Sequence, residues 1–196
     1  MPNSIIEQRI TGALLGDAHL EKKSLTANAR LRYEQSIKHS ARFYHFFNML
    51  ALMCAGNAVE RKRFDSRTGK TYGSLYFTTR SLPILTEFYQ LFYLNKVKVI
   101  PLNIASLLTP ITLAQWIADD GFFRYGLALQ TDSYTINEVT LLIEALRLNF
   151  GIESRVRLEK QKPVIYIPAS QMDLVRSIVL QHLDPSTYYK VGLGKI

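Results

Sequence analysis

The chain has 196 residues, 47% of them apolar, and a mean hydropathy near zero. This composition is typical of a globular protein with a packed core and excludes a disordered chain. Lys and Arg outnumber Asp and Glu by 24 to 16, and the whole excess lies in residues 1–105. Such a balance favours a polyanionic partner. We expect no disulfide, because Cys54 is the single cysteine, and neither a membrane-spanning segment nor a secretion leader.

The first part of the chain predicts helices and strands in alternation. Ser4 and Glu7 have the spacing of a capping box, which opens a helix that ends near Asp17. An alternating stretch follows at residues 30–37, which is typical of a strand. The remaining expectations are a helix over residues 41–54, strands over 59–64 and 72–79, and a helix over 82–94.

The same order returns in the second part. Thr109 and Pro110 suit the start of a helix that runs to Asp120, and Gly121 predicts a left-handed stop after it. Thr135 and Glu138 form another capping box. The expected elements are an alternating stretch over residues 122–130, a helix over 135–150, strands over 154–158 and 164–167, and a helix over 171–182.

Two short segments carry the repeat most clearly. Ile10–Ala18 and Leu113–Gly121 both predict apolar helices with small residues four apart that end in an acid, and aligning them pairs Asp17 with Asp120. The offset is 103 residues, about half of the chain. A carboxylate at the negative end of a helix is disfavoured unless a cation is near, so two such acids indicate a cation site. The sequence therefore predicts a duplication into half-domains 1–105 and 106–196.

These segments resemble the motif of the LAGLIDADG homing endonucleases (meganucleases), and in particular the single-chain members with two motifs. Leu113–Gly121 matches the pattern at its first two positions and at Asp120-Gly121, whereas Ile10–Ala18 is more divergent. Flanking matches include Lys98-Val-Ile-Pro and Tyr189-Lys190. The resemblance implies an α+β fold of two pseudo-twofold-related half-domains, each α-β-β-α-β-β-α. Each would carry a four-stranded antiparallel DNA-binding sheet, and the two motif helices would pack together in a monomer without an obligate protein partner.

The paired acids suggest the chemistry. We expect Asp17 and Asp120 to lie together at the pseudo-twofold axis, where adjacent carboxylates need a divalent cation. Oxygen ligands favour Mg²⁺, with Mn²⁺ as a substitute, and the main-chain carbonyls of Gly16 and Asp119 could complete the metal shell. The resemblance adds Lys98 and Lys190 as catalytic residues. Gln35 and Gln130 are weaker candidates for a water network. The expected reaction is metal-dependent hydrolysis that breaks both strands of a long, partly pseudo-palindromic DNA site.

The predicted strands place polar side chains in rows, because alternate residues share a face. Without the motifs, a solvated sheet face would explain these rows. With them, Arg and Lys could read guanine, Gln could read adenine, and the remaining basic residues could bind phosphate. The candidate DNA-binding residues are Arg30, Arg32, Glu34, Lys38, Arg61, Arg63, Lys70, Tyr72, Arg80, Arg124, Gln130, Arg155, Arg157 and Tyr166.

Two other functions remain open. An RNA-binding maturase that promotes splicing of a group I intron, its own intron RNA included, would share the fold, and a non-catalytic DNA-binding regulator would tolerate loss of the acids. Retention of Asp17 and Asp120 favours cleavage. The resemblance suggests an intron-encoded protein made in a mitochondrion or chloroplast, although a bacterial or phage source is also compatible.

Overall fold

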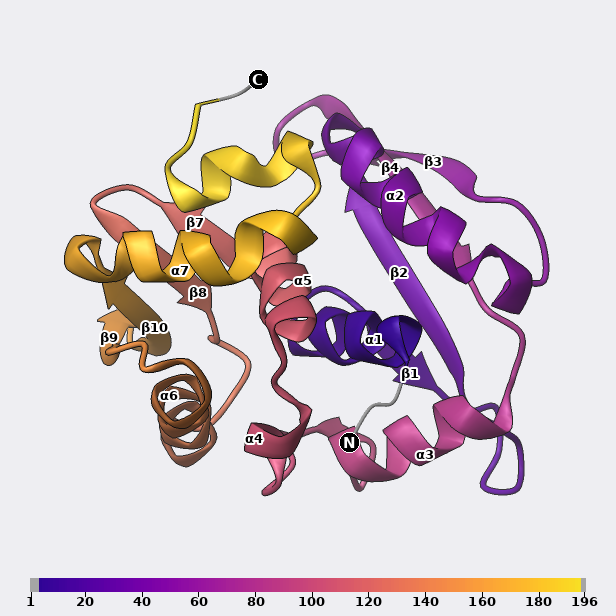
Figure 1. Cartoon of the computed structure of the whole chain (residues 1–196). Coiled ribbons are helices and arrows are strands. Elements are labelled where there is room, and N and C mark those ends of the chain that lie inside the picture. The colour runs from indigo at the N-terminus through magenta and orange to yellow at the C-terminus, as the bar shows by residue number, and fades with distance from the viewer. Residues whose placement is uncertain (1–3, 195–196) are drawn as a thin grey trace. The chain divides into compact units, whose positions relative to one another are not determined.

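The computed structural model describes residues 4–194, which form two compact α+β units. One unit comprises residues 17–90, and the other comprises residues 4–16 and 91–194. Each contains a four-stranded antiparallel sheet, with strand orders β1-β2-β4-β3 and β7-β8-β10-β9 (Figure 1). The repeated order confirms the predicted fold class. The half-domain boundary at residue 105 stays a prediction.

The unit of residues 17–90 is a sheet with a helix on one face. Its strands are β1 (His19–Glu21), β2 (Arg30–Ser36), β3 (Val59–Asp65) and β4 (Lys70–Thr78). Helix α2 (Ser40–Leu50) places Phe43 and Phe46 against Tyr33 and Phe77, and the centroid of the Tyr33 ring lies 4.9 to 6.0 Å from the other three. Helix α3 (Pro83–Phe92) crosses the boundary between the units. The aromatic core therefore fixes which face of the sheet is covered.

The other unit contains both motif helices. Its helices are α1 (Ile5–Leu15), α4 (Ile104–Leu107), α5 (Pro110–Asp120), α6 (Ile136–Phe150) and α7 (Met172–Val179). Its sheet consists of β7 (Gly121–Phe123), β8 (Gly126–Gln130), β9 (Arg155–Glu159) and β10 (Lys162–Pro168), and β5 (Tyr93–Leu94) pairs with β6 (Val97–Lys98) in a small hairpin. Helix α6 contacts β9 and β10. A 3-10 helix over Pro185–Val191 closes the chain.

The three helix starts read from the sequence are confirmed. The hydroxyl groups of Ser4 and Thr135 accept hydrogen bonds from the amides of Glu7 and Glu138, and both capping boxes are complete. Thr109 caps α5, with Pro110 in the first turn. These caps satisfy amides that have no partner within the helix, so they define where the motif helices begin.

Helices α1 and α5 approach each other closely because α1 has glycines where α5 has larger side chains. A Cβ atom at Gly12 would lie 2.4 Å from the carbonyl oxygen of Thr112 and 2.6 Å from Cβ of Gln115. A Cβ atom at Gly16 would lie 2.5 Å from Cβ of Asp119. Gly12 and Gly16 therefore form a recess, the glycine recess, into which Gln115 and Asp119 fit. The predicted packing of the motif helices is confirmed.

The expected left-handed stop at Gly121 is wrong. Gly121 has φ −69° and ψ 138°, which is extended backbone, and it begins β7 directly after α5. A glycine is nevertheless required, because a Cβ atom there would lie 2.5 Å from the carbonyl oxygen of Ile117. The chain thus passes from helix to strand without a loop, and the strand starts at the acid.

Two further expectations concern the single cysteine and membrane-spanning helices. Cys54 is a buried free cysteine, and burial raises the pKa of its thiol. Within residues 4–194, no helix combines the length and the apolar composition that a bilayer-spanning segment requires.

Replacing Gly12 with Ala should lower the free energy of unfolding by about 1–3 kcal/mol, because the new methyl group meets backbone that cannot move aside. This steric cost outweighs the higher helix propensity of alanine. Urea unfolding measures the effect. Gly56→Ala is the matched control, since no atom lies within 4 Å of its added Cβ, and it should change stability by less than about 0.5 kcal/mol. Equal effects at both positions would contradict the close approach.

Candidate functional site

A lysine holds the main-chain carbonyl that precedes each acid. Nζ of Lys98 donates a hydrogen bond to the carbonyl of Gly16, at 3.1 Å. Nζ of Lys190 donates to the carbonyl of Asp119, at 2.7 Å. Both carbonyls lie at the C-terminal ends of their motif helices, where a cation offsets the negative end of the helix dipole. The two lysines, predicted as a pair, therefore occupy matching positions.

The carboxylate of Asp17 has partners within its own unit. Nε2 of Gln35 donates to Oδ2 of Asp17, and the guanidinium of Arg42 lies 3.8 Å from the same oxygen. Arg42 also donates to Oε1 of Gln35, so the amide is oriented from both ends. Arg42 is only 5% exposed. The three side chains form a fixed group, which restricts the orientation of Asp17.

Arg42 was missed by the sequence analysis. The sequence feature that could have identified it is its position next to Phe43, on the side of the predicted helix that packs against the sheet. A buried arginine costs free energy unless it is paired, so its presence on the covered face indicates a nearby acid.

Gln130 is not the counterpart of Gln35. Gln35 is buried and alternates with outward-facing Glu34, so it lies on the face that α2 covers. Gln130 alternates with fully buried Leu129 and lies on the outward face of its sheet. The next residue, Thr131, is buried, and its hydroxyl donates to the carbonyl of Pro163. The support of Asp17 is therefore not repeated through Gln130, although Gln130 keeps a position suited to contact with a ligand of the sheet.

The side chain of Asp119 belongs to the interface between the motif helices. Its carboxylate is buried and accepts from Nε2 of Gln115 at 3.3 and 3.4 Å. Gln115 in turn accepts from Arg9, which also donates to the carbonyl of His182. Burial lowers the pKa of Arg9, while the charge of Asp119 partly opposes that shift. This arrangement leaves the carbonyl of Asp119, rather than its carboxylate, beside Lys190.

The uncovered face of the first sheet carries half of the predicted DNA-binding residues. Strand β3 is an edge strand and is exposed along nearly its whole length. The guanidinium groups of Arg32 and Arg61 lie 5.1 and 4.7 Å from the centroid of the Tyr76 ring. Glu34 accepts from the hydroxyl of Ser74 at 2.6 Å, which is the main reason why the pKa of Glu34 lies below its ordinary value. The residues on this face are Arg30, Arg32, Glu34, Arg61, Arg63, Lys70 and Tyr72.

Three residues assigned to these rows lie outside the strands. Lys38 belongs to a 3-10 helix over Ile37–His39 that follows β2. Arg80 follows β4, and its guanidinium donates to the carbonyl of Leu52. Arg124 lies in the turn between β7 and β8, 5.5 Å from the centroid of the Tyr125 ring. Alternation was extended past the strand ends in each case, and their predicted register is wrong.

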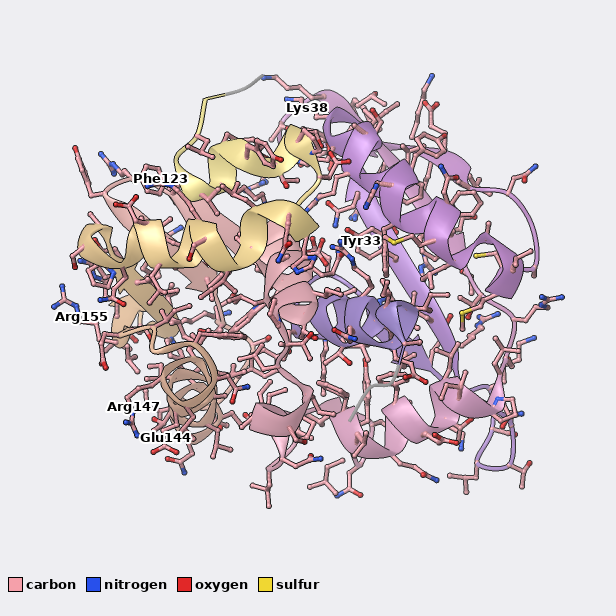
Figure 2. The ribbon with its side chains drawn as sticks, viewed as in Figure 1. Tyr33, Lys38, Phe123, Glu144, Arg147 and Arg155 are labelled. Atoms are coloured by element: carbon pink, nitrogen blue, oxygen red, sulfur yellow. The ribbon has the colours of Figure 1, made fainter. Side chains whose placement is uncertain are left out.

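The second sheet has a shorter polar row. Arg155 and Arg157 lie over the ring of Tyr166, 5.5 and 3.2 Å from its centroid. Arg155 extends outward from β9 in Figure 2. The hydroxyl of Tyr166 donates to the carbonyl of Tyr125. The Tyr166 side chain is therefore held by this hydrogen bond as well as by the two guanidinium groups over its ring.

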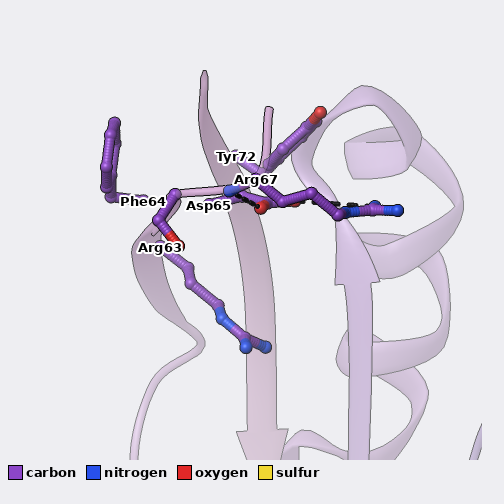
Figure 3. Close-up of a pocket in the computed structure, with 6 residues that line it drawn as sticks. Arg63, Phe64, Asp65, Arg67 and Tyr72 are labelled. Carbon is purple, nitrogen blue, oxygen red and sulfur yellow. Dashed lines mark hydrogen bonds and ion pairs between the residues drawn. The ribbon is translucent and has the colours of Figure 1, made fainter. Parts of the chain in front are cut away.

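The turn between β3 and β4 contains a hollow of about 480 Å³ (Figure 3). The backbone amide of Arg67 donates to Oδ1 of Asp65, and the Arg67 guanidinium lies 3.9 Å from Oδ2 of the same residue. The side chains of Arg63 and Arg67 point in different directions from this turn. The hollow is lined by Arg63, Phe64, Asp65, Ser66, Arg67 and Tyr72. Arg63 and Arg67 in its lining extend the row of basic side chains on β3 into the turn of the hairpin.

No group of three or more His, Cys, Asp and Glu side chains that could hold a metal ion occurs among residues 4–194. Any metal site would have to combine fewer side chains with carbonyl oxygens and a ligand.

Comparisons with known proteins agree with this architecture. A model of the LAGLIDADG DNA endonuclease family matches residues 8–175. The intron-encoded endonuclease ai4 of Dictyostelium discoideum is 32% identical over 76% of this chain and 98% of its own length. The cytochrome b mRNA maturase bI2 of Debaryomyces hansenii is 29% identical over 92% of this chain and 71% of its own length. Its Saccharomyces cerevisiae counterpart is longer, and this chain covers 46% of it.

The fold itself has been seen in a solved structure. The homing endonuclease I-WcaI bound to its DNA recognition sequence has a TM-score of 0.91, with 23% identity. The alignment covers 100% of this chain and 89% of that protein.

Replacing Ser74 with Ala should raise the pKa of Glu34 towards its ordinary value, because the hydroxyl is the main group that favours the ionised carboxyl. The lowered pKa contributes stability above the unfolded value, and that stability is lost as the pH falls through the folded value. NMR titration of the Glu34 carboxyl measures the shift. Thr71→Ala, on the opposite face of β4, is the control. An unchanged pKa in Ser74→Ala would contradict this role of the hydroxyl.

Proposed function

We propose that this chain, which belongs to the LAGLIDADG DNA endonuclease family, is a site-specific endonuclease that breaks both strands of a long DNA target. The observation that carries the proposal is the matched lysine beside each acid: Lys98 on the carbonyl of Gly16, and Lys190 on that of Asp119. A protein that only bound DNA would need neither the acids nor these lysines. Their duplication fits a reaction performed once on each strand.

The residues present fit a magnesium ion. Each half supplies a carboxylate, Asp17 or Asp120, and the carbonyl that precedes it, and such oxygen atoms are the ligands that Mg²⁺ prefers. Each carbonyl oxygen has two lone pairs, so one remains for a cation when the other accepts from lysine. When bound, Mg²⁺ would polarise the phosphodiester and lower the pKa of a bound water. Mn²⁺ would serve as a substitute.

The surrounding side chains have separate tasks in this proposal. Gln35 and Arg42 orient the carboxylate of Asp17 before the substrate arrives. Lys98 and Lys190 fix the carbonyls and place a positive charge where negative charge develops on the phosphate. Asp119 acts through its carbonyl, since Gln115 holds its carboxylate inside the helix interface.

The uncovered sheet faces provide the DNA-binding surface. Exposed Arg61, Arg63 and Arg157 can read guanine or bind phosphate, and Gln130 can read adenine. The two sheets share a strand order but differ in sequence, which suits a site that is only partly pseudo-palindromic. One chain carries both motifs, so no protein partner is required.

A maturase that assists intron splicing is the second candidate. The names of two maturase relatives, from Debaryomyces hansenii and Saccharomyces cerevisiae, favour it. The partner would then be the chain's own intron RNA. In either case the relatives suggest an intron-encoded protein of an organelle.

The first prediction of this proposal is that the purified chain with Mg²⁺ cuts a large DNA library at one recurring sequence. Sequencing of the new ends identifies the site. The variant Asp17→Asn with Asp120→Asn should bind the same DNA without cutting it, because amides cannot replace the two carboxylates as anionic ligands.

Two other outcomes separate the alternatives. Cutting by the double variant would show that the acids are not catalytic. Tight binding of intron RNA, unchanged in the double variant and without DNA cleavage by the parent chain, would favour the maturase.

The second prediction concerns the lysines. Lys98→Met and Lys190→Met should each slow cleavage by about 100- to 1,000-fold, because each removes a positive charge beside a reacting phosphate. Single-turnover cleavage of an end-labelled site at saturating protein measures each strand separately. Lys160→Met, in the exposed turn between β9 and β10, should cut at the parent rate. Unchanged rates in both motif variants would reject a catalytic role for the lysines.

A further inference from the structure

The strand after each acid presents one outward side chain two residues later, and the two side chains differ in chemistry. In the unit of residues 17–90 this side chain is His19 of β1, which faces Arg32 on β2 and then Thr78 on β4. In the other unit it is Phe122 of β7, which faces Ala128 on β8. The first row offers hydrogen-bond donors. The second row begins with hydrocarbon at Phe122 and Ala128.

The residues on either side of Phe122 face the covered side of the sheet, so Phe122 faces outward. Gly121 is buried, and the ring of Phe123 packs against Gly192 on the covered side. Phe122 is 58% exposed. The strand register therefore fixes Phe122 on the outward face of the sheet.

The position next to Phe122 in its row is also apolar. Ala128, directly opposite, has the smallest side chain that a Cβ permits and is 8% exposed. Tyr166, the next residue across the sheet, donates its hydroxyl to the carbonyl of Tyr125. The Arg157 guanidinium covers the ring of Tyr166. Of the pair Phe122 and Ala128, Phe122 is thus the side chain available to a ligand, and it has no polar atom, whereas the far end of the row is the exposed Arg155, opposite Tyr166.

An exposed aromatic ring on a DNA-binding face can meet one apolar group in the major groove, the C5-methyl of thymine. Two residues span at most about 7 Å, so Phe122 follows Asp120 closely enough to reach a base pair near the cut. Resting on the endonuclease function proposed above, we propose that Phe122 selects thymine near the cut in the half-site bound by β7–β10. The matching position of the other half-site is read by donors from His19 and Arg32.

This assignment also separates DNA from RNA. Uracil lacks the methyl group, and the major groove of an RNA helix is too narrow and deep for side chains to read. An apolar reader at Phe122 therefore adds affinity for DNA and none for an RNA helix of the same sequence. A protein adapted mainly to RNA would gain nothing from this exposed ring.

Deoxyuridine substitution tests the contact, because it removes the methyl group and leaves the pairing edge intact. In the site identified by library cleavage, each thymine is replaced singly by deoxyuridine, and cleavage is measured at limiting protein with Mg²⁺. We expect one position near the cut to lose about fourfold in cleavage, the effect of one buried methylene-sized group. In Phe122→Ala, thymine and deoxyuridine should be cut equally at that position.

The matched control is Leu158→Ala. Leu158 is 70% exposed on β9, on the opposite face of the same sheet from Arg157, and its variant should keep the parent sensitivity. The proposal is overturned if no thymine near the cut is sensitive, or if the sensitivity persists in Phe122→Ala. Failure of the parent chain to cut any sequence would instead overturn the endonuclease function, and this inference with it.

Discussion

The close contact between α1 and α5 is the constraint on which the candidate site depends. The glycine recess of α1 receives Gln115 and Asp119, so the two helix axes can approach more closely than side chains at Gly12 and Gly16 would allow. Helix α1 ends at Leu15, two residues before Asp17, and α5 ends at Asp120 itself. Because the recess fixes how the helices slide along each other, it also fixes where Lys98 and Lys190 find their carbonyls.

In each sheet the covered face packs into a core, and the uncovered face carries the side chains proposed to bind DNA. The covered face of the first sheet carries Tyr33 and Phe77, which build an aromatic core with α2. The uncovered face carries guanidinium groups stacked on tyrosine rings. Stacking reduces the number of conformations that an arginine side chain explores, so less entropy is lost when it binds a ligand. The binding surface is therefore partly ordered before DNA is present.

The sequence predicted the parts that depend on local patterns. Caps at Ser4, Thr109 and Thr135 and the repeat of Asp17 at Asp120 were readable because capping and helix ends follow short-range rules. The fold class and both lysine positions followed from the repeat and the family resemblance.

The remaining features depend on contacts between distant residues. Arg42 reaches Asp17 only because α2 packs against β2. Gln35 and Gln130, which were both candidates for a water network, lie on opposite kinds of face: Gln35 on the covered face of its sheet and Gln130 on the outward face. Alternation also gave no sign of where β2 and β4 end. Lys38 and Arg80 were therefore assigned to the polar rows of these strands, although both lie beyond the strand ends. Alternation gives the faces within a strand, but where a strand ends depends on the partner strand that pairs with it, which is distant in the sequence.

The glycine recess has a consequence for how the chain assembles. Residues that correspond in the repeat, Gly12 with Gln115 and Gly16 with Asp119, face each other across the helix pair, but one side is always a glycine. Two copies of α5 would instead oppose the carboxylates of Asp119 and the amides of Gln115 with no recess to hold them. The α5 surface is complementary to α1 and not to a second copy of α5. Association between chains through these helices is thereby disfavoured, and each chain completes its own helix pair.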